Sequence, residues 1–291
     1  MKITKDDEGL RFDKYLRRTL KHASLGMIYE FIRKGNVLVN NKKQKQNYRL
    51  QTNDELIYTI PIENFLASTK KPAYKQRFTI LFEDQDLLIV NKPAGLASHG
   101  GTGITDNLIA EARTYLKDIT SQSSLAHRLD RGTSGIVIIA KNKTALRSIN
   151  QALKRRDVNK TYLALVEGTM QPPQGTLTHK LERIKEDFTT KIITSEQGKI
   201  AKTSYQTLKN YPQHTLVKLQ LHTGRMHQLR AQLTITGHPI VGDNIYGKEE
   251  QPMKRLFLHA SQLSFQHPTT GKTISLSAPL PPELETFLKQ L

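Results

Sequence analysis

A polar loop near the middle of the chain holds the residue types best suited to chemistry. It runs His127-Arg128-Leu129-Asp130-Arg131-Gly132-Thr133-Ser134-Gly135 and leads directly into an apolar run that begins at Ile136. Catalytic groups often lie on loops that such a strand supports. The carboxylate of Asp130 could serve there as a nucleophile or as a general base. A turn braced by an Arg–Asp ion pair uses the same residue types, so spacing alone leaves both interpretations open.

The chain contains no cysteine and ten histidines. The missing thiols exclude disulfides, thiolate-bound metals, iron–sulfur clusters and cysteine nucleophiles. The histidines are scattered, and none forms the pair four residues apart around a Glu that a helical zinc site requires. We therefore expect neither a metal nor another cofactor, and we expect the chemistry to rest on Asp, Glu, His, Tyr, Lys, Arg or Ser.

The composition indicates an anionic partner. The formal net charge is +18 and the isoelectric point is near 9.9, and a positive field concentrates polyanions such as nucleic acid or an anionic membrane surface. The first residues, MKITKDDEGLRF, carry acids where a targeting peptide needs a basic or apolar run. Apolar runs such as 135–140 are far shorter than the ~20 residues that span a bilayer. We therefore expect a soluble, cytoplasmic protein whose partner is nucleic acid and not membrane.

Two amphipathic helices and a small hairpin are predicted at the start of the chain. Helical spacing within 11–21 places four apolar residues on one face: Phe12, Tyr15, Leu16 and Leu20. A second helix is predicted from the N-cap Ser24 to the C-terminal cap Gly35. Short strands are predicted at 37–39 and 56–60.

Basic side chains gather on the outer face of the first helix and in the turn of the hairpin. They are Lys14, Arg17, Arg18, Lys21, Lys42, Lys43 and Lys45. A single basic helix is commonly just a solvated face, but the second cluster nearby favours contacts with RNA phosphates. The stretch RFDKYL…IYEFIRKGNVLVNNKK resembles the small RNA-binding domain named after the fourth ribosomal protein of the small subunit. The resemblance implies a non-catalytic α/β module, placed at residues 1–62, that binds RNA.

A separate domain of mixed α and β structure, of the α+β class, is predicted after a linker. Residues 63–77 show no sustained period and contain Pro, Ser and Lys, which is typical of a linker. Over 78–291, short apolar strands alternate with helical stretches. The strands are expected at 78–82, 87–90, 135–140, 163–166 and 215–221, and the helices near 108–116 and 146–153.

The loop and its surroundings resemble one enzyme family. HRLDRGTSGIVIIAKN is similar to the signature of the RluA family of pseudouridine synthases, and further matching motifs stand in the family's order. These are LLIVNKPAGLASHGG, Lys160-Thr161-Tyr162, LHTGRMHQLRAQL, GHPIVGDNIYG and RLFLHASQLSFQHPTTG. The resemblance covers 78–291. It implies an isomerase that converts uridine to pseudouridine in structured RNA without a cofactor, on a mixed, mainly antiparallel sheet. Large-subunit ribosomal RNA is favoured as the substrate over transfer RNA.

The resemblance also implies roles for three residues. Asp130 is the catalytic carboxylate, Arg230 pairs with it through a planar fork, and Tyr162 stacks on the uracil and helps the C5 proton leave. A guanidinium suits this task because burial alone would favour a protonated carboxylate. For Tyr162, a place as a half-buried core aromatic is the alternative.

Four further residues are expected to contact the substrate. Arg128 helps to fill the gap that a flipped-out base leaves in the RNA. The others are His127, Lys160 and Arg225, and His127 alternatively braces the loop. We expect a monomer with no obligate protein partner.

The family's pattern is not matched everywhere, and it leaves rival functions. Where the family often has Lys-Asp, Pro and His, this chain has Arg131-Gly132, Gly100 and Gln232, which affects loop contacts and substrate preference but not the reaction. A non-catalytic RNA-binding or ribosome-assembly protein could keep the scaffold, although Asp130 and Arg230 are intact. A nucleoside or glycoside hydrolase normally needs two carboxylates, and only one motif carboxylate is apparent.

Overall fold

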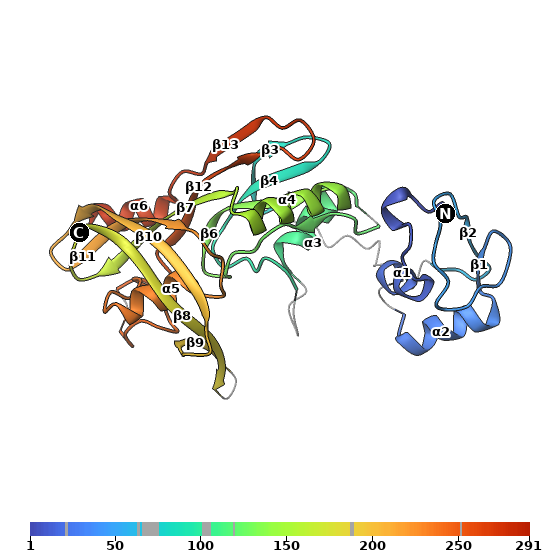
Figure 1. Ribbon diagram of the computed structural model, residues 1–291, viewed down its shortest axis with the longest axis horizontal. Helices are drawn as coiled ribbons and strands as arrows, with labels where there is room; N and C mark the ends of the chain where they lie inside the picture. Colours follow the sequence, from blue (N-terminus) through green and yellow to red (C-terminus); the bar gives the residue numbers. More distant parts are fainter. Residues whose placement is uncertain are drawn as a thin grey trace. The chain divides into compact units, whose positions relative to one another are not determined.

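The computed structural model describes residues 1–20, 23–62, 65, 76–100, 106–118, 120–186, 189–250 and 252–291 (Figure 1). The chain forms two compact units, and each is described by itself. The first consists of Met1–Gln76 with the short segments Glu111–Ser124 and Asn142–Thr144, and the second of Arg77–Ala110, Leu125–Lys141 and Ala145–Leu291. Among the described residues, no helix has both the length and the apolar character needed to cross a membrane.

Lys21 and most of the predicted linker fall outside the described residues. The boundaries 1–62, 63–77 and 78–291 therefore stay predictions.

The first unit is a pair of helices with a small hairpin. It contains a short 3-10 helix, η1 (Lys5–Asp7), then α1 (Phe12–Thr19), α2 (Leu25–Lys34) and the antiparallel strands β1 (Val37–Val39) and β2 (Leu56–Tyr58). Both predicted caps of α2 are confirmed, because the Ser24 side chain accepts a hydrogen bond from the N–H of Met27 and Gly35 has a φ of 80°. The apolar face predicted for α1 is buried: Phe12, Tyr15, Leu16 and Leu20 are each at most 1% exposed.

The second unit is built on one large sheet. Its strand order is β3-β4-β6-β12-β7-β11-β10-β8-β9, with β13 paired to β12 and β5 paired to β6. β6 and β12 are parallel, and the other strand registers described for this sheet are antiparallel. The strands are β3 (Thr79–Glu83), β4 (Leu87–Lys92), β5 (Ser124–Leu125), β6 (Ser134–Ala140), β7 (Asn159–Glu167), β8 (Gln174–Glu186), β9 (Thr189–Thr194), β10 (Lys199–Asn210), β11 (His214–Leu221), β12 (Leu258–Gln266) and β13 (Thr273–Ser277). The predicted α+β class and mainly antiparallel sheet are confirmed.

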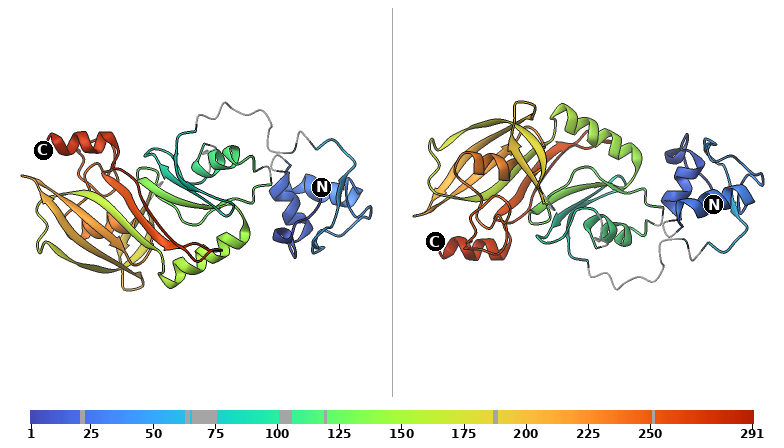
Figure 2. Two further views of the ribbon diagram at one scale, coloured as in Figure 1. Left: turned by 90° about the horizontal axis from the view of Figure 1, so that it is seen from above. Right: turned by 90° about the horizontal axis from the view of Figure 1, so that it is seen from below.

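Helices flank this sheet. They are α4 (Lys143–Arg155), α5 (Gln228–Ile235) and α6 (Pro282–Lys289), whereas α3 (Leu108–Tyr115) is divided between the two units after Ala110. Ala145 and Ile149 of α4 join an apolar cluster with residues of β4, β6 and β12, and both views in Figure 2 show α4 along one side of these strands. Ala231 of α5 packs with Leu181 of β8 and Ile192 of β9. The sequence predicted α3 and α4 but not α5 or α6.

The start of β6 is held close to β12. β6 is buried along its whole length. Gly135 has a φ of 118°, and a Cβ atom at this position would overlap the carbonyl group of Ala260 in β12. A residue without a side chain is therefore required here. This close approach fixes the downstream end of the loop that carries Asp130.

Candidate active site

Asp130 lies in the loop between β5 and β6, and the backbone on both sides of it is held by hydrogen bonds. The N–H of Leu129 donates to Ser98 Oγ at 3.1 Å, and the Ser98 hydroxyl donates to the Leu129 carbonyl at 2.5 Å. The N–H of Thr133 donates to the carbonyl of Asp130 at 3.1 Å. The Asp130 side chain remains 25% exposed. The backbone that carries the carboxylate is thus fixed, and the side chain is open to a substrate.

Arg230 contacts Asp130, but its planar fork binds another carboxylate. Arg230 Nη1 lies 3.4 Å from Asp130 Oδ2. Its Nε donates to Asp243 Oδ2 and its Nη2 donates to Asp243 Oδ1, both at 2.7 Å. The predicted contact with Asp130 is therefore present, but the prediction that the fork serves Asp130 is wrong. Asp243 takes the two-bond edge of the guanidinium, formed by Nε and Nη2, whereas Asp130 is contacted only by Nη1.

Asp243 is a second motif carboxylate, which corrects the expectation that only one is present. It lies in the motif GDNIYG and its side chain has no exposed surface. Burial alone would raise its pKa, but bonds from Arg230 and from the N–H groups of Ile245 and Tyr246 lower the pKa overall. Burial likewise opposes the charge of Arg230, yet Asp243 and Asp130 raise its pKa overall. Both oxygens of Asp243 are engaged, so Asp130 alone offers a free carboxylate oxygen in this pair.

Tyr162 is a buried residue of β7. It pairs with Leu219 of β11 and with Ala260 of β12, and it is 6% exposed. Burial raises the pKa of its phenol, and the negative charge of Asp130 raises it further. The hydroxyl therefore keeps its proton near neutral pH. The effect of Asp130 shows that the two side chains lie within electrostatic reach of each other.

His127 is placed as a brace of the loop. Its Nε2 accepts a hydrogen bond from the N–H of Ile138 in β6 at 3.2 Å. Burial lowers the pKa of the imidazole to about 3, and the positive charge of Lys160 contributes to this shift. A neutral ring with Nε2 occupied matches the alternative role that the sequence left open, and the contact with substrate stays a prediction.

The other predicted substrate-binding residues differ in exposure. Lys160 of β7 is half-buried, and burial lowers the pKa of its amine. Arg128 and Arg225 are exposed. Arg225 is held by a hydrogen bond from Nε to the carbonyl of Ile200 in β10 at 3.2 Å, which leaves its terminal nitrogens for other partners. All three positions are compatible with RNA contacts, which stay predictions.

Two residues that border Asp130 were not predicted as site residues. His227 directly precedes α5 with a φ of 48°, and its Nε2 lies 3.8 Å from Asp130 Oδ2. Its Nδ1 lies 3.0 Å from the hydroxyl of Tyr246, whose ring also lies 5.2 Å from the guanidinium carbon of Arg230. Both residues belong to motifs that the sequence singles out, HQLR and GDNIYG, but spacing could not show that they meet.

Lys92 ties the end of β4 to the same loop. The side chain has no exposed surface, and its Nζ donates to the carbonyls of Pro93 at 3.0 Å, Leu96 at 2.8 Å and Arg131 at 3.4 Å. Burial lowers the pKa of this amine to about 7, against the opposing effect of Asp130. A buried lysine is tolerated here because carbonyl oxygens accept its N–H groups.

Gln232, a departure from the family's pattern, has a structural role. It is fully buried in α5, and its Oε1 accepts a hydrogen bond from the Thr203 hydroxyl at 2.6 Å. Its Nε2 donates to the carbonyls of Leu177 and Ala201, both at 3.1 Å. These bonds join α5 to β8 and β10, so this departure affects how the site is supported and not a direct contact with substrate.

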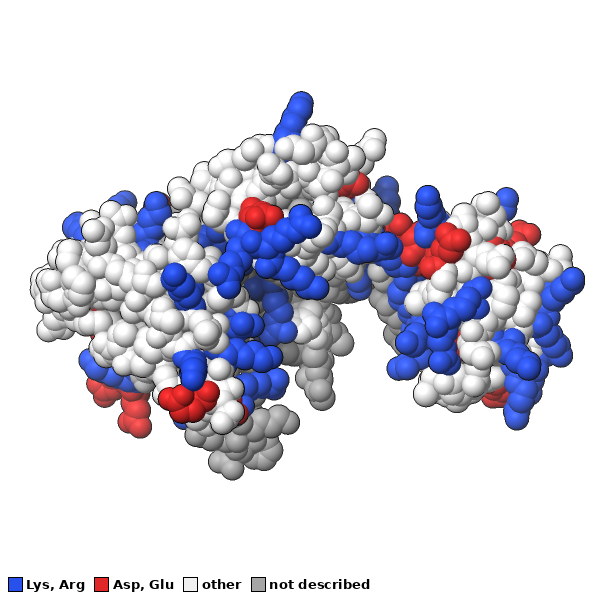
Figure 3. Space-filling model, viewed as in Figure 1, with Lys and Arg blue, Asp and Glu red and all other residues white. Residues whose placement is uncertain are grey.

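The predicted RNA-binding cations of the first unit fall into two groups. Exposed side chains belong to Lys14, Arg17, Lys42, Lys43 and Lys45. Arg18 is different, because it bonds Asp7 at 2.7 Å and lies over the ring of Tyr15, which corrects its expected role as a free phosphate ligand. Lys21 is outside the described residues. Figure 3 shows many Lys and Arg side chains on the surface of this unit.

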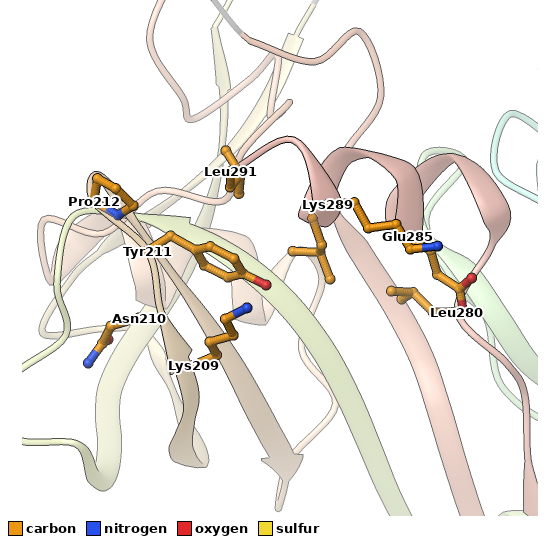
Figure 4. Close-up of a pocket in the computed structure, with 9 residues that line it drawn as sticks. Lys209, Asn210, Tyr211, Pro212, Leu280, Glu285, Lys289 and Leu291 are labelled. Carbon is orange, nitrogen blue, oxygen red and sulfur yellow. The ribbon is translucent and has the colours of Figure 1, made fainter.

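A groove of about 860 Å³ lies away from these residues. It is formed between the β10–β11 turn and α6, where Lys209 Nζ stands 4.6 Å from the ring centre of Tyr211 (Figure 4). It includes none of the predicted site residues. Within the described part of the chain, no group of three or more His, Asp or Glu is arranged to hold a metal.

Comparisons with known proteins agree with this geometry. Residues 86–234 match the family model described as RNA pseudouridylate synthase, and residues 10–56 match the model of the S4 domain. The chain is 40% identical to "Ribosomal large subunit pseudouridine synthase C" of Pasteurella multocida, over 99% of this chain and 92% of that protein. The protein of the same name from Escherichia coli K12 is 36% identical, over 99% of this chain and 95% of that protein.

Two solved structures are also similar. "Human RNA Pseudouridylate Synthase Domain Containing 1" has a TM-score of 0.61 at 29% identity and covers 74% of this chain and 89% of its own. "Human RNA Pseudouridylate Synthase Domain Containing 4" has a TM-score of 0.60 at 28% identity and covers 73% of this chain and 92% of its own. The resemblances seen in the sequence are confirmed. The chain belongs to the RNA pseudouridylate synthase family and carries an S4 domain ahead of its synthase domain.

Proposed function

We propose that this enzyme isomerises uridine to pseudouridine in large-subunit ribosomal RNA, with Asp130 as its catalytic carboxylate. The observation that carries the assignment is the pairing of a partly exposed Asp130 with a buried Arg230 at 3.4 Å. A neighbouring guanidinium favours the ionised form of a carboxylate, and an ionised carboxylate is the form that acts as nucleophile or base.

The reaction needs no added atoms. The bond from N1 of uracil to the ribose carbon breaks, the base turns, C5 bonds to the same carbon, and the proton of C5 leaves while N1 gains one. A single carboxylate next to the ribose suffices for this sequence, since no water has to be activated across the bond. A hydrolase would require a second free carboxylate, and both oxygens of Asp243 are held by Arg230 and backbone N–H groups.

Tyr162 is proposed to stack on the uracil once the base has left its helix. Its burial and the electrostatic effect of Asp130 on its pKa support this role. Because burial raises the pKa of the phenol, Tyr162 acts in its protonated form. It therefore contributes as a stacking surface and a hydrogen-bond donor, and not as a phenolate base that removes the C5 proton unaided.

The choice of substrate is supported by the relatives. Full-length relatives carry the name of a large-subunit ribosomal synthase, and the first unit is an S4 domain with exposed cations. Those cations are proposed to bind phosphates outside the active site. The proposal includes a monomer that acts in the cytoplasm, where ribosomal RNA would meet it, and no obligate protein partner.

The test maps pseudouridines in ribosomal and transfer RNA from cells that lack the gene. A defined set of large-subunit uridines should lose the modification and regain it with the intact gene. Asp130→Asn should not restore it, whereas Asp157→Asn, an exposed Asp outside the site, should. Loss confined to transfer RNA would overturn the substrate assignment, and restoration by Asp130→Asn would overturn the catalytic one.

A further inference from the structure

A line of hydrogen bonds runs from strand β9 to Asp130. β9 is the last strand of the main sheet path, so one of its edges has no strand partner there. On β9 the N–H of Ile192 donates to the hydroxyl oxygen of Tyr246 at 2.9 Å. The same hydroxyl lies 3.0 Å from His227 Nδ1. His227 Nε2, on the far side of the ring, lies 3.8 Å from Asp130 Oδ2.

The chemistry of each group fixes the direction of these bonds. A backbone N–H can only donate, so the Tyr246 oxygen accepts from Ile192 and its single proton is free for another partner. That proton is retained, because burial raises the pKa of Tyr246. The contact of 3.0 Å to His227 Nδ1 offers an acceptor for this proton. A neutral imidazole that accepts at Nδ1 carries its own proton at Nε2.

Burial favours the neutral form of the His227 ring. Asp130 and Asp243 attract a second proton, while Arg230 and Arg128 repel it, and burial is the largest influence; together they lower the pKa of His227. In this tautomer the proton of the uncharged ring is on Nε2, the atom that lies 3.8 Å from Asp130 Oδ2. His127 carries the opposite tautomer, since its Nε2 accepts from a backbone N–H.

Asp130 Oδ2 faces two N–H donors, both at long range. Arg230 Nη1 is at 3.4 Å and His227 Nε2 at 3.8 Å, beyond the usual ~2.7–3.2 Å of such bonds. Catalytic hydrogen bonds are often long in a free enzyme and tighten when substrate binds. Asp130 Oδ1 has no hydrogen-bond partner among the described residues.

We propose that Tyr246 and His227 are positioning residues for Asp130: the Tyr246 hydroxyl fixes the His227 tautomer, and the resulting Nε2–H holds Oδ2 together with Arg230, so that Oδ1 meets the substrate. The inference rests on the proposed catalytic role of Asp130. It assigns to β9 a part in catalysis through a main-chain group.

Tyr246→Phe is the sharpest test, because it removes the hydroxyl and keeps the ring that packs on Arg230 and His227. The saturating single-turnover rate should fall about tenfold, which corresponds to ~1.4 kcal/mol in the activation free energy. The RNA concentration that gives half of the saturating rate should stay unchanged. The matched control is Tyr205→Phe, which removes the hydroxyl that donates to the Pro172 carbonyl at 3.1 Å. It should keep the full rate.

Variants of His227 separate the donor from the ring. Gln carries a side-chain N–H near the position of Nε2, whereas Asn carries one near Nδ1. His227→Gln should retain most of the rate, and His227→Asn should lose as much as His227→Ala. Equal rates for the Gln and Asn variants would overturn the proposed role of Nε2–H.

Nitrogen NMR reads the tautomer without any dependence on activity. In long-range ¹⁵N–¹H spectra, the ring signals that vanish in His227→Gln belong to His227. They should show a protonated Nε2 and a bare Nδ1, and Tyr246→Phe should mix the two tautomers. A protonated Nδ1 in the intact enzyme, or a full rate in Tyr246→Phe, would refute the inference. If Asp130→Asn is active, the proposed function fails instead, whatever the spectra show.

Discussion

Positive charge is used in opposite ways in the two units. Arg230 in the synthase domain is 8% exposed and contacts two carboxylates. Lys42 and Lys45 of the S4 unit are exposed, and these two have no ion pair among the described residues. A buried, oriented charge can stabilise a reacting group because water does not screen it. An exposed charge instead contributes affinity that depends on salt. Under the proposed function, the chemical step belongs to the synthase domain and the capture of RNA to the S4 unit.

The largest effect should come from the carboxylate itself. Asp130→Asn should reduce the single-turnover rate by roughly 10³-fold or more, because the amide can act neither as nucleophile nor as base. RNA affinity, measured by filter binding, should stay nearly unchanged. A rate within tenfold of the parent would break the division between the two regions.

The next effect concerns the fork of Arg230. Arg230→Lys keeps the charge but removes the paired hydrogen bonds to Asp243, so the rate should fall by about 100-fold. Since a buried pair is broken, the free energy of unfolding should fall by about 3 kcal/mol. Arg147→Lys, an exposed Arg of α4, is the control and should change neither value. If Arg230→Lys has the same free energy of unfolding as the parent, the bonds to Asp243 do not stabilise the fold.

Replacing exposed cations of the S4 unit should change binding and spare the rate. Lys42→Gln, Lys43→Gln and Lys45→Gln together should lower the slope of log affinity against log salt by about 0.7–0.9 for each phosphate that the protein no longer neutralises. Arg18→Gln should leave that slope unchanged, because Arg18 is already paired with Asp7. Equal slopes for the parent and the triple variant would show that these lysines are only solvated.

The last effect is a dependence of stability on pH, which is smallest near neutral pH. His127 has a folded pKa of about 3, against about 6.5 in an unfolded chain. Between these values the unfolded state binds a proton that the folded state does not, so stability falls as the pH drops from 6.5 toward 3. In denaturant unfolding, the free energy of unfolding of His127→Gln should fall less steeply with decreasing pH than that of the parent. The two slopes should differ by about one proton, or ~1.4 kcal/mol per pH unit. Parallel curves for the two proteins would contradict the bracing role.

The elements that the sequence predicted have a clear apolar pattern, either on one face of a helix or along a whole strand. α1 and α2 have apolar residues at helical spacing and clear caps, and β6 is a continuous apolar run. β8 and β10 were missed because charged and polar residues are frequent along both strands, so that no continuous apolar run marks them. α5 was missed because its buried residues include Gln228, Arg230 and Gln232, whose polar groups find partners only in the folded chain.

The site shows the same limit. The order of motifs pointed to Asp130, Tyr162 and Arg230, although no spacing rule could decide which carboxylate takes the fork of Arg230. Asp243 follows Arg230 by thirteen residues and returns to it through the turn after α5. The approach of His227 and Tyr246 depends on that turn as well. Such contacts follow from the path of the backbone, which residue types alone do not give.

The donor that orients Tyr246 belongs to the main chain of Ile192 and not to its side chain. Related enzymes could therefore exchange the residue at this position freely and keep the link, so that comparisons of sequences would find no trace of it. Only proline, which lacks the N–H, would break it directly. What is inherited at this point is the register of β9 against β8, in which Ile192 stands opposite Arg183. An insertion or deletion in that hairpin would alter the link even if every recognisable motif residue stayed in place.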